Sequence, residues 1–268
     1  MSATVDAERF SRYLNHAPII NVPGRTFPVV TQYLEDAVEL TNFSIDENVV
    51  RSRKFRYGDE WDDEDTVDPS YTSTNTLPGY SKETRTTLSR INESQIQYNL
   101  IVKLIETIAT HPEYVQYSKA ILVFLPGIGE IRKLNDFLMG HHYFSNYGAD
   151  GGWLIYPLHS SIASEEQEAA FLIPPRGSRK IILATNIAET GITIPDITCV
   201  IDSGRHKEMW FNERRQLSRL VEHFISKANA KQRRGRAGRV QEGLCFHLFT
   251  KERFDSWVCA VPSLPPLP

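Results

Sequence analysis

Apolar runs and amphipathic stretches alternate through the second half of the chain. Segments with the length of strands and a mainly apolar centre lie at residues 119–125, 153–158, 180–185 and 198–204. Segments with helical spacing separate them, at residues 129–139 and 164–171. Continuous apolar strands that alternate with helices are typical of a parallel sheet covered on both faces. We therefore predict an α/β fold with helices on both sides of a parallel sheet.

Weaker patterns precede and follow this core. The spacing of apolar positions from Ile91 to Ile108 predicts a half-buried helix that ends before Pro112. Four further elements are predicted: short helices at 6–14 and 33–40, a strand at 18–22 and a last strand at 243–250.

Residues 208–225 have the pattern of two strands around a polar turn, which predicts a protruding basic β-hairpin. Its candidate contact residues are Lys207, Arg214, Arg215 and Arg219. A solvated edge hairpin is the alternative. The next segment, 228–238, is predicted to form a short helix.

Residues 51–90 are charged, then rich in Ser and Thr, and contain few aliphatic side chains. This composition predicts a disordered insertion. Within it, residues 59–68 hold seven acids and no base. The acids are interpreted as a solvated linker, with a docking site for a basic partner as the alternative. The proline-rich residues 261–268 are interpreted as the start of a linker, or else a polyproline ligand.

The formal net charge of −3 over 268 residues hides an uneven distribution. Residues 205–239 contain eleven Lys or Arg against three Glu, which indicates a basic face. The three cysteines form no CxxC pair, which argues against a disulfide framework or a zinc cluster, so we predict no metal site. The polar N-terminus and the lack of an apolar run of about 18 residues predict an intracellular protein that does not contact membranes.

Four arginines crowd into QRRGRAGR, residues 232–239. Arg236 and Arg239 are three apart, so in a helix they would share a face and could hold a polyphosphate. The two glycines of the segment would let the backbone approach another group closely. A solvated basic helix or a patch for a nucleic-acid backbone is the alternative.

A second polar segment, residues 184–197, directly follows the strand at 180–185. Loops at the carboxyl ends of parallel strands offer hydroxyls and amides to ligands. A threonine-rich turn without a ligand is the alternative. The two segments together are a more specific indication of a phosphate site than either segment alone.

Segments 184–197 and 232–239 resemble motifs V and VI of superfamily 2 helicases of the DEAH/RNA helicase A type. Residues 121–131 resemble motif IV of these helicases, and 156–171 resemble the segment that follows it. Ser2, Ala3 and Thr4 resemble motif III, which couples the two motor domains, and 23–29 resemble the link to the second motor domain. The insertion and residues 80–101 resemble a large-insertion subgroup that acts on structured RNA, including helicases of the translation machinery.

The resemblance implies roles in nucleotide chemistry. Arg236 and Arg239 would be arginine fingers that neutralise charge on the γ-phosphate, and Gln232 would position the attacking water or contact the γ-phosphate. Phe171 would stack on the adenine, although a core phenylalanine is the alternative, and Thr193 would approach the ribose. The chain differs from the family pattern at two positions. It has Pro195 where many relatives have an Asp, and Gly191, near the phosphates, where many have a Ser.

For RNA, the resemblance implies phosphate contacts that read no bases. The matching positions are Gly127, Ser160, Thr185 and Asn186. The hairpin would lie at the duplex junction and part the strands.

The chain contains no GxxxxGK[ST] and no DExH sequence. Because a P-loop Lys and a Walker-type Asp hold the phosphates and Mg²⁺, the chain alone is predicted to be inactive, and ATP with Mg²⁺ would bind mainly to a preceding first RecA-like domain. The expected division is a motif III stub and linker at 1–22, a second RecA-like domain at 23–250 with the insertion at about 51–90, and the start of a linker at 251–268.

By this resemblance, the full-length protein is predicted to be an ATP-dependent 3′→5′ RNA helicase. The alternative is a non-catalytic module that binds RNA or protein. Expected partners are RNA, single-stranded or structured, and the first RecA-like domain, with the ribosome as a further candidate. The cytoplasm is the expected compartment, with the nucleus as the alternative, by analogy with the subgroup. The sequence gives neither the RNA target nor the oligomeric state.

Overall fold

A computed structural model describes residues 7–20, 27–45, 79–144, 152–189, 194–212 and 216–256. Within this part of the chain, a six-stranded sheet is parallel at every pairing. The strand order is β1 (Val29–Gln32), β8 (Gly243–His247), β5 (Cys199–Asp202), β2 (Ala120–Phe124), β4 (Arg179–Ala184) and β3 (Trp153–Leu158). The predicted RecA-like parallel α/β fold is confirmed.

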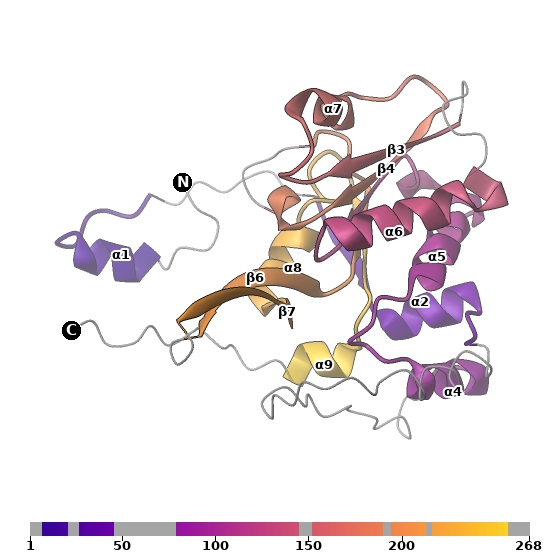
Figure 1. The fold of residues 1–268 in the computed structure, drawn as a ribbon, viewed down its shortest axis with the longest axis horizontal. Coiled ribbons are helices and arrows are strands. Elements are labelled where there is room, and N and C mark those ends of the chain that lie inside the picture. The colour runs from indigo at the N-terminus through magenta and orange to yellow at the C-terminus, as the bar shows by residue number, and fades with distance from the viewer. Residues whose placement is uncertain are drawn as a thin grey trace.

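Helices flank this sheet (Figure 1). The α-helices of the described residues are α1 (Ala7–Tyr13), α2 (Leu34–Thr41), α4 (Lys82–Arg90), α5 (Tyr98–Thr110), α6 (Ile128–Met139), α7 (Ser164–Glu168), α8 (Lys227–Arg234) and α9 (Lys251–Ser256). Short 3-10 turns are η2 (Val115–Tyr117), η3 (His142–Phe144), η4 (Ala169–Phe171) and η5 (Asn186–Ala188).

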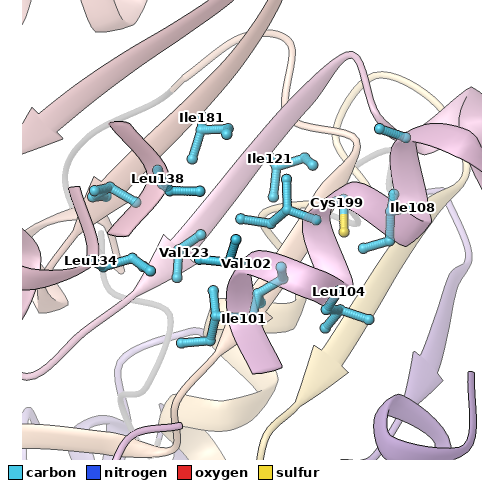
Figure 2. Close-up of a cluster of buried hydrophobic side chains, with 14 of the residues drawn as sticks. Ile101, Val102, Leu104, Ile108, Ile121, Val123, Leu134, Leu138, Ile181 and Cys199 are labelled. Carbon is cyan, nitrogen blue, oxygen red and sulfur yellow. The ribbon is translucent and has the colours of Figure 1, made fainter. Parts of the chain in front are cut away.

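Alternate residues of β2 enter two separate cores, because successive side chains of a strand point to opposite faces. Ile121 and Val123 pack with apolar side chains of α5 and α6, as Figure 2 shows. Leu122 and Phe124 pack on the other face, where Ala170, Ala188 and Ala237 come from turns rather than long helices. The sheet is therefore buried on both faces, which explains why its strands have no alternation of polar and apolar residues.

Strands β6 (Arg205–Asn212) and β7 (Leu217–Phe224) pair antiparallel and form the predicted hairpin. The hairpin protrudes from the body of the domain (Figure 1). Its base is fixed by Phe224, whose ring lies 4.3 Å from the Arg205 guanidinium and 4.5 Å from that of Arg253 in α9. Such cation–π contacts stabilise the junction between the hairpin and the main sheet.

Several predicted elements differ from the structure. The helix expected from Ile91 begins only at Tyr98, because the preceding residues form turns in which Asn92 accepts a bond from the Ser94 amide. Residues 18–20 form no strand, and the rest of that predicted strand lies outside the described residues. Instead, β1 pairs with β8. We did not predict β1, because its four residues are too few to show a strand pattern.

The predicted disordered insertion at 51–90 extends too far. Its last nine residues form α4, whose N-terminus is capped by Ser81 accepting from the Thr84 amide at 3.2 Å. Leu88 packs in a small core with Leu34 and Val38, so one buried leucine and a cap are enough to order this segment. Residues 51–78 lie outside the described part. The expected linker from residue 251 also begins as a helix, α9.

Candidate functional site

The carboxyl ends of β2, β4 and β3, which are neighbours in the sheet, open into one cleft of about 560 Å³. It is lined by Pro126, Gly127, Ile128, Gly129, His159, Ser160, Thr185, Asn186, Ile187, Lys207 and Leu220. Loops at this edge of a parallel sheet form ligand sites in many α/β proteins. The structure thus brings together five predicted contact residues from four separate segments of the chain.

The cleft is lined by two glycines and by residues with short polar side chains. Gly127 caps α6, so the positive end of the helix dipole faces the cleft. Ser160 and Asn186 are exposed, whereas the Thr185 side chain is buried. A groove with these donors suits phosphate oxygens rather than the edges of bases.

His159 also lines the cleft, and sequence reasoning missed it. Its Nδ1 accepts a hydrogen bond from the Ser161 amide at 3.0 Å and lies 2.8 Å from Ser161 Oγ. Since Nδ1 is the acceptor, the proton of a neutral ring is on Nε2, which can donate. Its position directly after an apolar strand and beside Ser160 could have predicted that His159 lines the cleft.

Lys207 of β6 reaches across the cleft wall to α6. Its Nζ lies 2.9 Å from both carboxylate oxygens of Glu130. Arg219, on the partner strand β7, is exposed and lies next to Leu220 of the cleft. The hairpin therefore contributes one side of the cleft, with Lys207 held by an acid that the sequence analysis did not single out.

Glu189 connects the cleft to the arginine-rich segment. It ends the turn that begins with Thr185 and Asn186. Its buried side chain accepts from Asn229 and lies 3.1 Å from Arg233 Nε, and its backbone carbonyl accepts from Arg236. One residue thus joins the loop after β4 to three positions of residues 229–236.

Arg233 has no exposed side-chain surface. Its Nη1 donates to Asp202 Oδ1 at 2.8 Å and to the Arg205 carbonyl at 3.2 Å, and its guanidinium lies 4.8 Å from the Phe124 ring. Two carboxylates, Glu189 and Asp202, compensate its charge in the interior, as buried charges require. Arg233 is therefore structural, a role that the sequence alone did not separate from those of its neighbours.

The same network includes His247, whose Nδ1 is 3.1 Å from Asp202 Oδ2. Burial by itself would raise the pKa of Asp202, but Arg233 and His247 lower it to about 2. Burial would lower the pKa of His247, but the Cys245 sulfur and the Asp202 carboxylate raise it to about 10. The imidazole is therefore a cation at neutral pH.

We predicted that Arg236 and Arg239 would share a helix face. That prediction is wrong, because α8 ends at Arg234 and both residues lie in the non-helical segment that follows. Arg236 is half-buried and Arg239 is exposed. Burial, and next the positive charge of Arg239, lower the pKa of Arg236. The second cause shows that two guanidinium charges act on each other here, an arrangement that an anion would relieve.

Gly238 makes the close approach that the glycine pattern predicted, although to protein and not to a ligand. Its carbonyl accepts from the Phe27 amide at 2.8 Å. A Cβ at this position would lie 2.5 Å from the Phe27 carbonyl oxygen and 2.7 Å from Val29 Cγ2. The backbone after Arg236 is thereby pressed against the segment that enters β1.

Gln232 is half-buried on α8. Phe171 is half-buried in η4 and packs against the second core. The carbonyls on either side of it, of Ala170 and Leu172, both accept from the buried Lys180 Nζ at 3.0 and 2.9 Å. Lys180 also pairs with Asp196 at 2.6 Å, so the backbone around Phe171 is fixed from within the domain.

The remaining predicted site residues lie outside the described part of the chain. They are Ser2, Ala3, Thr4, Gly191, Thr193, Arg214 and Arg215. Among the described residues, no group of three or more His, Cys, Asp or Glu side chains is placed to hold a metal ion. The same residues include no helix with the length and apolar character needed to cross a bilayer.

Comparison with known proteins shows the family of this chain. Residues 99–241 match the family described as helicase conserved C-terminal domain. The chain is 44% identical to ATP-dependent RNA helicase dhx29 of Xenopus laevis over 96% of its length, and 44% identical to the chloroplastic DExH-box ATP-dependent RNA helicase DExH4 of Arabidopsis thaliana over 95%. It spans 20% and 18% of these two relatives.

A solved structure is also similar. The E. coli DExH-box NTPase HrpB superposes with a TM-score of 0.61 at 29% identity, over 96% of this chain and 23% of HrpB. The family match covers more than half of the chain, and the relatives share the DExH type that the motifs indicated. The chain therefore belongs to the helicase conserved C-terminal domain family, as the second RecA-like domain of a DEAH-type helicase.

Proposed function

We propose that this chain is the half of an ATP-dependent RNA helicase motor that supplies the arginine fingers and one side of the RNA track. The observation that carries the proposal is the turn 185–189. Its first residues, Thr185 and Asn186, line the cleft, and its last, Glu189, holds Arg233 and Arg236. A movement of these arginines would therefore move the turn that lines the cleft.

On the nucleotide side, Arg236 and Arg239 would neutralise the γ-phosphate and Gln232 would orient the attacking water. Burial and the like charge of Arg239 lower the pKa of Arg236, and a polyphosphate would compensate the two guanidinium charges. ATP with Mg²⁺ supplies the phosphoryl group that is transferred. The described residues hold no metal-binding cluster, so Mg²⁺ and most phosphate contacts would come from a first RecA-like domain.

Phe171 would stack on the adenine. Its half-exposed ring is compatible with that role, and the Lys180 contacts would keep the ring in place. Gly191 and Thr193 are proposed to lie near the phosphates and the ribose, and the motif III residues Ser2, Ala3 and Thr4 to couple the two motor domains.

On the RNA side, the Gly127 amide, Ser160, Thr185 and Asn186 would contact phosphates of a single strand, with Lys207 at the hairpin. These groups read no bases, which suits a motor that must move along any sequence. The hairpin, with Arg214, Arg215 and Arg219 on or near it, would part the strands as the motor moves 3′→5′. The cytoplasm remains the predicted compartment.

Arg239→Ala in the full-length protein tests this proposal against the alternative of a binding module. We expect the RNA-stimulated ATPase rate to fall by roughly 10³–10⁵ while RNA affinity is retained, because an arginine finger acts on the transition state. An unchanged ATPase rate would mean that the domain is a module for binding RNA or protein.

A further inference from the structure

Lys207, which lines the proposed RNA cleft, forms an ion pair with Glu130 of α6. A Cβ built on Gly127 would lie 3.0 Å from Glu130 Oε2 and 3.1 Å from Lys207 Nζ. The pair therefore lies directly against the residue whose amide is proposed to hold an RNA phosphate. Both side chains are partly exposed, 22% for Glu130 and 27% for Lys207, so solvent and ligands reach them.

The carboxylate of Glu130 resembles a bound phosphate in its contacts. It lies in the first turn of α6, where the positive end of the helix dipole favours an anion. It receives Lys207 through both oxygens at 2.9 Å. A helix N-terminus and a lysine are the two groups that would otherwise bind a phosphate oxygen at this point.

This arrangement has a cost for RNA binding. A phosphate that approaches Gly127 must displace the carboxylate from Lys207, or else remain beside an uncompensated negative charge. A strand that contacts Ser160 and Asn186 at the same time presents its next phosphate to Gly127 at a high effective concentration, which a single free phosphate does not have.

We propose that Glu130 is an internal competitor for the RNA backbone, which holds Lys207 until a continuous strand displaces it. The pair also bridges α6 and β6, so its opening would release one tie between the domain body and the hairpin. The inference rests on the proposed RNA cleft, because the competition exists only if phosphates bind beside Gly127.

Glu130→Gln tests the competition in titrations of the chain with a labelled single-stranded oligouridylate over a range of salt concentrations. The amide keeps the size of the side chain but not its charge. We expect roughly three- to fivefold tighter binding, and a plot of log K against log salt that is steeper by about one ion. The extra ion appears because Lys207 then carries a counterion that the phosphate releases.

Two further variants separate the competition from a general loss of negative charge. Glu208→Gln makes the same charge change one residue from Lys207, but the Glu208 carboxylate pairs with His206 at 3.5 Å and not with Lys207. It should alter affinity by much less. In a Lys207→Met background, Glu130→Gln should lose most of its effect, because the residue for which the carboxylate competes is gone.

Equal gains from Glu130→Gln and Glu208→Gln, or a gain that persists with Lys207→Met, would overturn the inference while leaving the cleft intact. No change with Glu130→Gln, in a chain that binds the oligouridylate, would do the same. If the folded chain and all variants fail to bind the oligouridylate at low salt, the proposed RNA cleft itself is wrong. Circular dichroism of each variant establishes that it is folded.

Discussion

Arg233 and Asp202 form a fully buried ion pair, with Nη1 2.8 Å from Oδ1 and no exposed side-chain surface on either residue. The pair joins helix α8 to the end of strand β5, next to the start of the hairpin. Arg233 is thus the anchor of the arginine-rich segment, while Arg236 and Arg239 are its accessible cations. Arginines that look alike in sequence therefore differ in burial, because Arg233 is buried, Arg236 is half-buried and Arg239 is exposed.

The anchor role predicts a large loss of stability in Arg233→Met. The methionine fills much of the space but removes the guanidinium that pairs with both Asp202 and Glu189, and breaking a buried ion pair typically costs about 3–5 kcal/mol. Urea unfolding monitored by circular dichroism measures this loss. The matched control is Arg234→Met, at a half-buried neighbour, which should change the free energy of unfolding by less than about 1 kcal/mol. Similar losses for both variants would contradict the assignment.

The Asp202–His247 pair predicts how stability depends on pH. The pKa of His247 is raised to about 10 in the folded chain, so its contribution is complete below the unfolded value of about 6.5 and is lost as pH rises towards 10. Asp202, with its pKa lowered to about 2, contributes above about pH 4 and loses its effect in acid. The free energy of unfolding should therefore fall between about pH 6.5 and pH 10.

His247→Gln checks the origin of that fall. The variant removes the titrating imidazole, so the slope over the alkaline range should become shallower, even though the variant is less stable at neutral pH. Urea titrations at several pH values measure the slope. An equally steep loss in the variant would assign the pH dependence to other groups.

The two glycines of the arginine-rich segment should respond differently to alanine. Gly238→Ala places a methyl against the Phe27 carbonyl and Val29, and the backbone must move, at a cost of about 1–3 kcal/mol. Gly235→Ala meets nothing closer than 3.4 Å and should be neutral within about 0.5 kcal/mol. Thermal unfolding of both variants provides the comparison, and an equal shift in Tm would argue against the close approach at Gly238.

The buried strands and the hairpin could be predicted because each shows its own pattern of apolar and polar residues within a short stretch of sequence. The runs at β2 and β4 are apolar on both faces and are long enough to be distinct. The predicted contacts Gly127, Ser160 and Asn186 also meet in one cleft, because each follows a strand of the same sheet. The position of a residue directly after a predicted strand is therefore enough to predict that it lies at this edge of the sheet.

Other features depend on contacts between distant residues and leave no local pattern. Arg233 is set apart only by Glu189 and Asp202, which are 44 and 31 positions away in the chain. Strand β1 is ordered by pairing with β8, which lies more than 200 residues later in the sequence. Helix α4 lacks an apolar stripe, and its order comes from Ser81 and the burial of Leu88. No window of sequence contains these partners together.

The central claim is that Arg236 and Arg239 are one half of a catalytic centre whose other half lies on a preceding motor domain. The most direct measurement is the ATP turnover of the purified 268-residue chain, with and without single-stranded RNA. We expect a background rate in both conditions, with Arg236→Ala indistinguishable from the unsubstituted chain. Multiple turnovers that Arg236→Ala abolishes would show that the chain holds a complete catalytic centre, and would contradict the claim.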